Sequence, residues 1–210
     1  MQLPNNIAFA LATVFAAAVS VTAATNATEA VCTATNTFAA GDFVEYTGGW
    51  SKANGRVFRV KVATATLFTI EGLDTTDTSL FPAGAGTGTV RKITTWVPIT
   101  GVTSAEISGG DGKNVEVPLL DSDAPVMLPD GFTATTVTLT TADDRSLPHH
   151  AALKKVSDSV ALTCLRGTLP GGSVLLYAGY CSFNESMSLS KGSVMAVKSM
   201  FSLQNKVVRY

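Results

Sequence analysis

The stretch that decides the fold class is Gly41-Asp42-Phe43-Val44-Glu45-Tyr46, followed by a turn at Gly48-Gly49 and by Arg56-Val57-Phe58-Arg59-Val60-Lys61-Val62. A third run, Leu67-Phe68-Thr69-Ile70, comes shortly afterwards. Each run is short, rich in β-branched and aromatic residues, and bounded by Gly, Asn or Asp, which is typical of strands joined by tight turns. The stretch therefore predicts three neighbouring strands and a β-rich protein.

The strand pattern stops between Glu71 and about Thr89, where neither a helical nor a strand period is present. Connections without regular structure that exceed roughly 12–15 residues are uncommon in compact domains and tend to be functional or disordered. This one contains Leu73, Leu80 and Phe81, apolar residues that a disordered linker has little reason to keep. We therefore expect a neighbouring molecule to order the loop at 72–88, which would make the protein a building block.

Composition narrows the class of protein. The chain has 210 residues, of which 46% are hydrophobic and 15% charged, so it is long enough for one domain with a full core and is not a disordered chain. A net charge of −1 excludes the broad basic footprint of a dedicated nucleic-acid binder. The scattered basic residues of the first half are interpreted as solvated charges on strand faces: Lys52, Arg56, Arg59, Lys61, Arg91 and Lys92.

The cysteines give information about compartment rather than chemistry. Cys32, Cys164 and Cys181 are an odd number, lie far apart and have no C-x-x-C spacing, so neither a disulfide framework nor a zinc site is predicted. Cys164 and Cys181 would be able to pair in an oxidising compartment, but free buried thiols are the favoured interpretation. A reducing cytoplasm fits this pattern.

The N-terminal segment allows two interpretations. Residues 1–28 carry no charge, and Ala16-Ala17-Ala18 would suit signal-peptide cleavage, but the Lys or Arg that normally precedes a signal's apolar core is missing. We favour an opening strand or an extended arm, and we expect no membrane span. In the alternative, the protein is a secreted or surface-displayed β-rich binding protein with an N-terminal signal peptide, and the long loop is its ligand site.

The middle of the chain contains turns that resemble ligand motifs only superficially. Residues 105–108 and 115–117 are expected to form a hairpin around Gly109-Gly110-Asp111-Gly112. Residues 121–125, with two carboxylates, are interpreted as a surface loop, because the glycine and the flanking helices of a calcium-binding EF-hand are missing. Residues 84–88 are a turn rather than a phosphate loop, since no helix follows. Alternation over 133–140 predicts a half-buried strand.

One helix is predicted, over residues 146–158, with Ser146 or a nearby Asp as its cap and Pro148 in its first turn. Adjacent His149 and His150 point about 100° apart on a helix and do not readily chelate one ion, so we expect both in an exposed first turn. A hydrolase that uses one of these histidines is the least favoured alternative, because no nucleophile elbow is present. The sequence predicts no enzyme, no catalytic or metal site and no cofactor.

The C-terminal third is again strand-like. Strands are expected at 160–165, at 174–183 paired with 186–190, at 194–203 as the longest, and at 207–210. A β-rich domain of this kind must protect its sheet edges, and closing sheets across subunits into a ring is one way to do so.

The order of these segments resembles the major tail tube proteins of long-tailed, non-contractile bacteriophages (siphophage type). The resemblance covers nearly the whole chain. It rests on a Thr/Ala-rich opening, a single helix, a β-rich finish and these blocks: Gly41–Gly48, Glu71–Thr78, Phe81–Gly84, Trp96–Ile99 and Ser108–Asp111. The chain departs from the family pattern at residues 7–24, which are more apolar than an exposed arm should be.

The resemblance implies a mainly β, sandwich- or barrel-like tail tube fold with one flanking helix, assembling into a hexameric ring around an inner β-barrel. Rings would stack into a hollow tube through which the genome passes into the host. Two parts are expected: residues 1–37 as N-terminal arm and first strand, and 38–210 as a single domain. The arm and the loop at 72–88 would reach the adjacent ring, with these predicted contact residues: Leu73, Asp74, Thr75, Asp77, Leu80, Phe81 and Pro82.

The resemblance also implies partners and location. The tube would assemble in the host cytoplasm around a tape-measure protein, be capped by a tail terminator and join distal tail or baseplate proteins. Because passing DNA must not be retained by basic side chains, we predict a neutral to acidic lumen.

Overall fold

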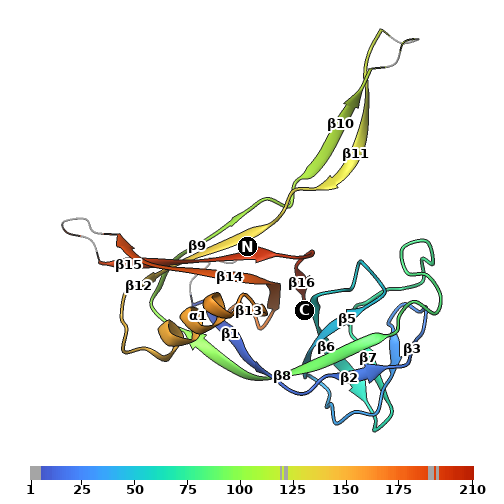
Figure 1. The fold of residues 1–210 in the computed structure, drawn as a ribbon, viewed down its shortest axis with the longest axis horizontal. Helices are drawn as coiled ribbons and strands as arrows, with labels where there is room; N and C mark the ends of the chain where they lie inside the picture. Colours follow the sequence, from blue (N-terminus) through green and yellow to red (C-terminus); the bar gives the residue numbers. More distant parts are fainter. Residues whose placement is uncertain (1–5, 119, 121–122, 189–191, 193) are drawn as a thin grey trace.

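The computed structural model describes residues 6–118, 120, 123–188, 192 and 194–210. In this part of the chain the fold is mainly β with one helix, which confirms the predicted fold class. Fourteen strands form one strongly curved sheet in the order β3-β4-β7-β6-β5-β8-β1-β13-β14-β15-β12-β9, with β2 beside β8 and β16 beside β14. Figure 1 shows two lobes joined by the long strand β8 (Gly88–Ile99), with a hairpin projecting from one of them.

The small lobe contains residues 41–70, the stretch that predicts three neighbouring strands. It comprises strands β2 to β7 and the first half of β8; the bounds are β2 Val19–Val21, β3 Ala23–Ala24, β4 Val31–Thr33, β5 Phe43–Gly48, β6 Arg56–Ala63 and β7 Leu67–Ile70. β5 pairs with β6 and β6 with β7, both antiparallel, as predicted. Tyr46, Trp50 and Phe58 fill the core of this lobe and are almost fully buried.

Strand β1 (Ala8–Phe15) lies in the interior of the sheet, paired with β8 on one side and β13 on the other. Leu11 and Ala12 are completely buried, which explains why this segment is apolar without alternation. Residues 8–15 therefore belong to the body of the fold rather than to an arm. Cleavage near Ala18 would remove a central strand.

The helix lobe contains β1, the second half of β8 and these further strands: β9 Val102–Ser108, β12 Thr136–Ala142, β13 Leu162–Thr168, β14 Val174–Ser188, β15 Ala196–Leu203 and β16 Val208–Arg209. β12 alternates buried and half-buried residues as predicted. The predicted pairing of 174–183 with 186–190 is wrong, because 174–188 is one strand that pairs with β15. β14, not the 194–203 segment, is therefore the longest strand in the described residues.

Helix α1 (Pro148–Ser159) packs on one face of this lobe, close to the predicted range. Pro148 occupies the first turn as expected, but the predicted side-chain cap is wrong: Leu147 is the N-cap residue and makes no capping hydrogen bond. The Ser146 hydroxyl instead donates to Asp144 Oδ1 at 2.6 Å, which closes a turn before the helix. Leu153 of the helix is fully buried against the sheet core.

The predicted hairpin around 109–112 is wrong. β9 pairs with β12, whereas β10 (Gly112–Val117) pairs with β11 (Val126–Phe132) in a separate two-stranded sheet. Gly109 and Gly110, with φ values of 81° and 84°, connect the end of β9 to the start of β10. A Cβ on Gly109 would lie 2.0 Å from the Ala134 carbonyl oxygen, so the two chain segments approach too closely for any other residue.

Candidate assembly surfaces

The long loop at 72–88 is held by its own chain. Asn26 Nδ2 donates to the carbonyl oxygens of Thr75 and Phe81, both at 2.8 Å, and Trp50 Nε1 donates to the Pro82 carbonyl at 3.0 Å. The Phe81 ring packs edge-on against Trp50, with ring centroids 5.5 Å apart. The expectation that a neighbouring molecule orders this loop is therefore wrong, because these contacts fix it within one subunit.

The seven predicted contact residues divide into two groups. Leu73, Thr75 and Phe81 are buried in the small lobe, where the Thr75 hydroxyl donates to the carbonyl of Thr25 at 2.9 Å. The other four are exposed to solvent: Asp74, Asp77, Leu80 and Pro82. Only this second group is free to touch another molecule.

Both exposed carboxylates of the loop are bound by local turns. The Thr76 backbone and hydroxyl donate to Asp74 Oδ1, and these bonds lower the pKa of Asp74. The Ser79 hydroxyl and backbone do the same for Asp77, whose pKa is also lowered. The loop therefore presents two fixed negative charges next to the exposed side chain of Leu80.

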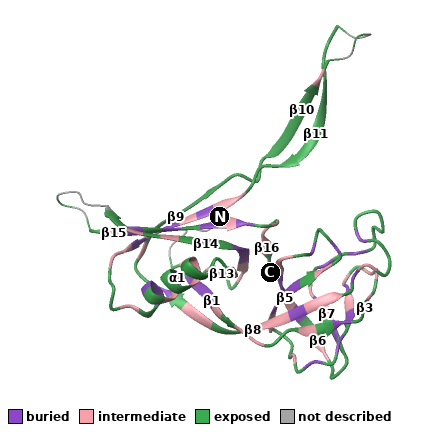
Figure 2. Ribbon diagram, viewed as in Figure 1, coloured by how far each residue is buried: buried purple, intermediate pink, exposed green. Residues whose placement is uncertain are grey.

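The projecting hairpin is a feature that the sequence analysis missed. We call residues 112–132, which contain β10 and β11, the arm; Figure 2 shows it exposed along almost its whole length. Register pairs Val115 with Leu128 and Val117 with Val126, so these four aliphatic side chains share one face. Alternate residues such as Glu116 and its partner Met127 lie on the other face. The sequence signal for this hairpin was the alternation of apolar residues before Pro118 and again after Pro125.

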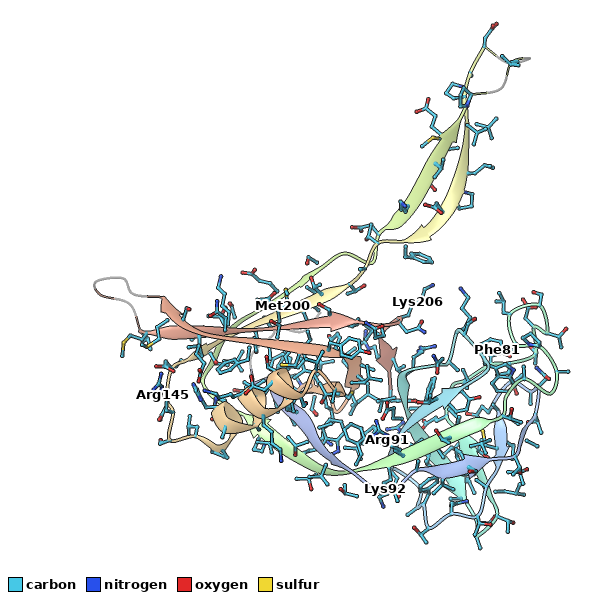
Figure 3. The ribbon with its side chains drawn as sticks, in the orientation of Figure 1. Phe81, Arg91, Lys92, Arg145, Met200 and Lys206 are labelled. Atoms are coloured by element: carbon cyan, nitrogen blue, oxygen red, sulfur yellow. The ribbon has the colours of Figure 1, made fainter. Side chains whose placement is uncertain are left out.

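A groove of about 1000 Å³ opens between the base of the arm and the small lobe. We call it the basic groove, because Lys52, Arg56 and Lys206 line it. Its lining also includes three apolar side chains: Leu80, Phe132 and Leu203. Lys206 Nζ lies 3.9 Å from the centre of the Phe132 ring, and Arg56 Nη1 donates to the Lys52 carbonyl at 3.1 Å. Burial lowers the pKa of Arg56, and its Nε is a buried donor without a hydrogen-bond partner in the described residues. Figure 3 places Lys206 below the arm and Phe81 across from it in the small lobe.

The cations assigned to strand faces are not all simply solvated. Four of the six form ion pairs, at 2.5 to 2.6 Å: Arg59 with Glu71, Lys61 with Glu29, Arg91 with Glu45, and Lys92 with Asp42. Lys52 and Arg56 have no ion pair within the described part of the chain, and both line the basic groove.

The two histidines are not exposed, so that expectation is wrong. Both residues lie in the first turn of α1, which packs against β14, and both are almost fully buried. The His150 ring packs edge-on against Phe183 at 5.0 Å, and its Nε2 lies 3.7 Å from Asp143 Oδ1. Burial, with a smaller contribution from His150, lowers the pKa of His149, whose Nδ1 has no hydrogen-bond partner in the part of the chain that the structure describes. Both histidines are therefore interior residues of this lobe.

The cysteines are free and buried, as predicted. Burial raises the pKa of Cys32 and Cys181 to about 12 and raises that of Cys164 further. Thiols held in this way are poor nucleophiles at neutral pH.

The described residues contain no group of three or more His, Cys, Asp or Glu side chains placed to bind a metal ion. None of their helices has the length and apolar character required to cross a membrane.

Comparison with known proteins identifies a family. A model of the phage tail tube protein (TTP) family matches residues 48–210. No curated protein sequence matches the chain. Among solved structures, a chain from the virion of a native gene transfer agent (GTA) particle is similar with 12% sequence identity and a TM-score of 0.42, over 55% of this chain and 88% of that chain. At this level the likeness carries no argument about fold or function.

Proposed function

This chain belongs to the phage tail tube protein family, and we propose that six copies form a ring and that stacked rings form the hollow tube of the tail. The protein is a structural component of the virion tail, where it assembles with copies of itself. Membership in this family favours a tail tube role over the alternative of a secreted binding protein.

The observation that carries the ring proposal is the open, curved sheet. Its two ends are β9, which pairs with β12, and β3, which pairs with β4. Unpaired strand edges are templates for association, and a ring of subunits removes them by letting each sheet meet the next. The antiparallel β9-β12-β15-β14 part of the sheet suits an inner β-barrel.

The bore of this barrel would be lined by the face of these strands that points away from α1. Cross-strand register places Thr138, Met200 and Ser182 in one row of that face, next to Glu106 of β9. A neighbouring row contains Thr140 and Lys198. A lining of Thr and Ser with one carboxylate and one ammonium is close to neutral, as passage of DNA without retention requires.

The same proposal extends to partners. The tube would form in the host cytoplasm around a tape-measure protein, end at a tail terminator and continue into distal tail or baseplate proteins. The exposed residues of the long loop are proposed contacts between subunits or rings: Asp74, Asp77, Leu80 and Pro82.

Negative-stain microscopy of the purified chain at high concentration tests the proposal. We expect rings with sixfold symmetry and stacked tubes with a central hole. A chain that stays monomeric over the whole concentration range would refute it.

A further inference from the structure

Among the described residues, the two strands of the arm pair only with each other. β10 and β11 form a separate two-stranded sheet, and their aliphatic face of Val115, Val117, Val126 and Leu128 is open, with Leu128 51% exposed. An isolated two-stranded hairpin is marginally stable in water, and an exposed apolar face of this kind marks an interaction surface. The arm therefore requires a cover from outside its own subunit.

The arm and its base are strongly acidic. Residues 109–134 contain five carboxylates and one ammonium, whereas the whole chain has a net charge of −1, so the rest of the chain is net basic. The ammonium, Lys113, pairs with Asp130 at 2.6 Å. Asp111, Glu116 and Asp123 have no ion pair in the described part of the chain.

The basic groove has the complementary composition. Lys52, Arg56 and Lys206 supply three cations without carboxylate partners among the described residues, and Leu80 and Leu203 supply apolar wall. Leu80 is 47% exposed, so the wall on that side is open to an incoming side chain. The groove thus offers what the arm lacks: apolar cover and positive charge.

The arm cannot reach the groove of its own subunit. Its base, including Gly110, Gly131 and Phe132, is one wall of that groove, and from there the strands run away from both lobes (Figure 1). Building on the proposed tube, we infer that the arm of one copy docks in the basic groove of a neighbouring copy. Because donor and acceptor surfaces differ, the contact is heterologous, and it propagates around a ring or from ring to ring.

Charge reversal with rescue tests this contact. The arm variant carries Glu116→Lys and Asp123→Lys, and the groove variant carries Lys52→Glu and Lys206→Glu; all four side chains are exposed, so the fold should tolerate each change. At low ionic strength each variant alone should form tubes at least about tenfold more slowly than the natural sequence, because complementary charges control association rates. A chain with all four changes should recover most of the natural rate, since the pairs are restored with reversed sign.

A matched control reverses charges on the exposed surface of α1, Lys155→Glu with Asp158→Lys, and should leave the rate unchanged. Light scattering gives the rate, microscopy identifies the product, and thermal melting confirms that each variant is folded. Normal tube formation by both single-surface variants, or slow formation without rescue in the combined one, would overturn the arm–groove contact and leave the tube proposal standing. Absence of rings and tubes from the natural sequence would overturn both.

Discussion

Replacing Phe81 by alanine should destabilise the isolated subunit, because this side chain anchors the long loop to its own core. Phe81 is 7% exposed and packs edge-on against Trp50 at 5.5 Å. Truncating a buried phenylalanine costs about 3–5 kcal/mol, and a surface loop that relaxes around the cavity favours the lower end, about 3 kcal/mol. For a domain of this size the melting temperature should fall by about 6–12 °C.

The measurement is urea unfolding of the monomer at low protein concentration, followed by Trp fluorescence, for which Trp50 is a direct reporter. Leu80→Ala is the matched control: it truncates the neighbouring side chain, which is 47% exposed, and should change stability by less than about 0.5 kcal/mol. If Phe81→Ala and Leu80→Ala unfold at the same urea concentration, the loop is not fixed by its own subunit and the reasoning fails.

Three further predictions concern the interior. Because burial holds the pKa of His149 below 6.5 in the folded protein, the unfolded chain binds a proton at this residue more readily. The contribution of His149 to stability should be fully present above pH 6.5 and be lost as the pH falls below it. In melting curves recorded at several pH values, His149→Leu should reduce this loss of stability at low pH. Gly88→Ala should lower the free energy of unfolding, measured in urea, by about 1–3 kcal/mol, because the added Cβ would lie 2.1 Å from the Thr47 carbonyl oxygen. Gly112→Ala is the control: its Cβ would meet open space, so it should lower this free energy by less than about 0.5 kcal/mol. The three cysteines should resist a thiol reagent in the native protein and react after denaturation, and rapid native labelling would contradict their burial.

The strands that sequence analysis located correctly pair mostly with their neighbours in sequence. β5, β6 and β7 follow one another through short turns, so local alternation and turn residues suffice to specify them. Pairing of distant segments leaves no such local signal. β1, for example, lies between β8 and β13. The Thr163 hydroxyl donates to the Ala12 carbonyl at 2.7 Å, although the two residues are 151 positions apart in the sequence. This pairing is what makes residues 8–15 a strand of the body of the fold and not an arm. It depends on residues far along the chain, so the sequence near the N-terminus alone does not reveal it.

The two histidines illustrate a different limit. A proline in the first turn correctly indicated a helix, but it does not indicate which side of the helix meets the sheet. That choice depends on β14, whose Phe183 packs against His150. Burial of the first turn is therefore a property of the tertiary packing.

The long loop and the arm show why apolar residues in a sequence do not reveal which core will bury them. Apolar residues in a stretch without periodicity indicate burial, and this is correct for Leu73 and Phe81. Periodicity says nothing about whether the burying core belongs to the same chain, and here that core comes from Trp50 and Asn26, which lie well before the loop. The arm gives the opposite case, because its regular alternation suggests an ordinary strand pair, yet within the described structure its apolar face has no core to meet. The sequence signal for the proposed contact between copies is therefore an alternating strand pair that no third strand or helix covers in the described structure.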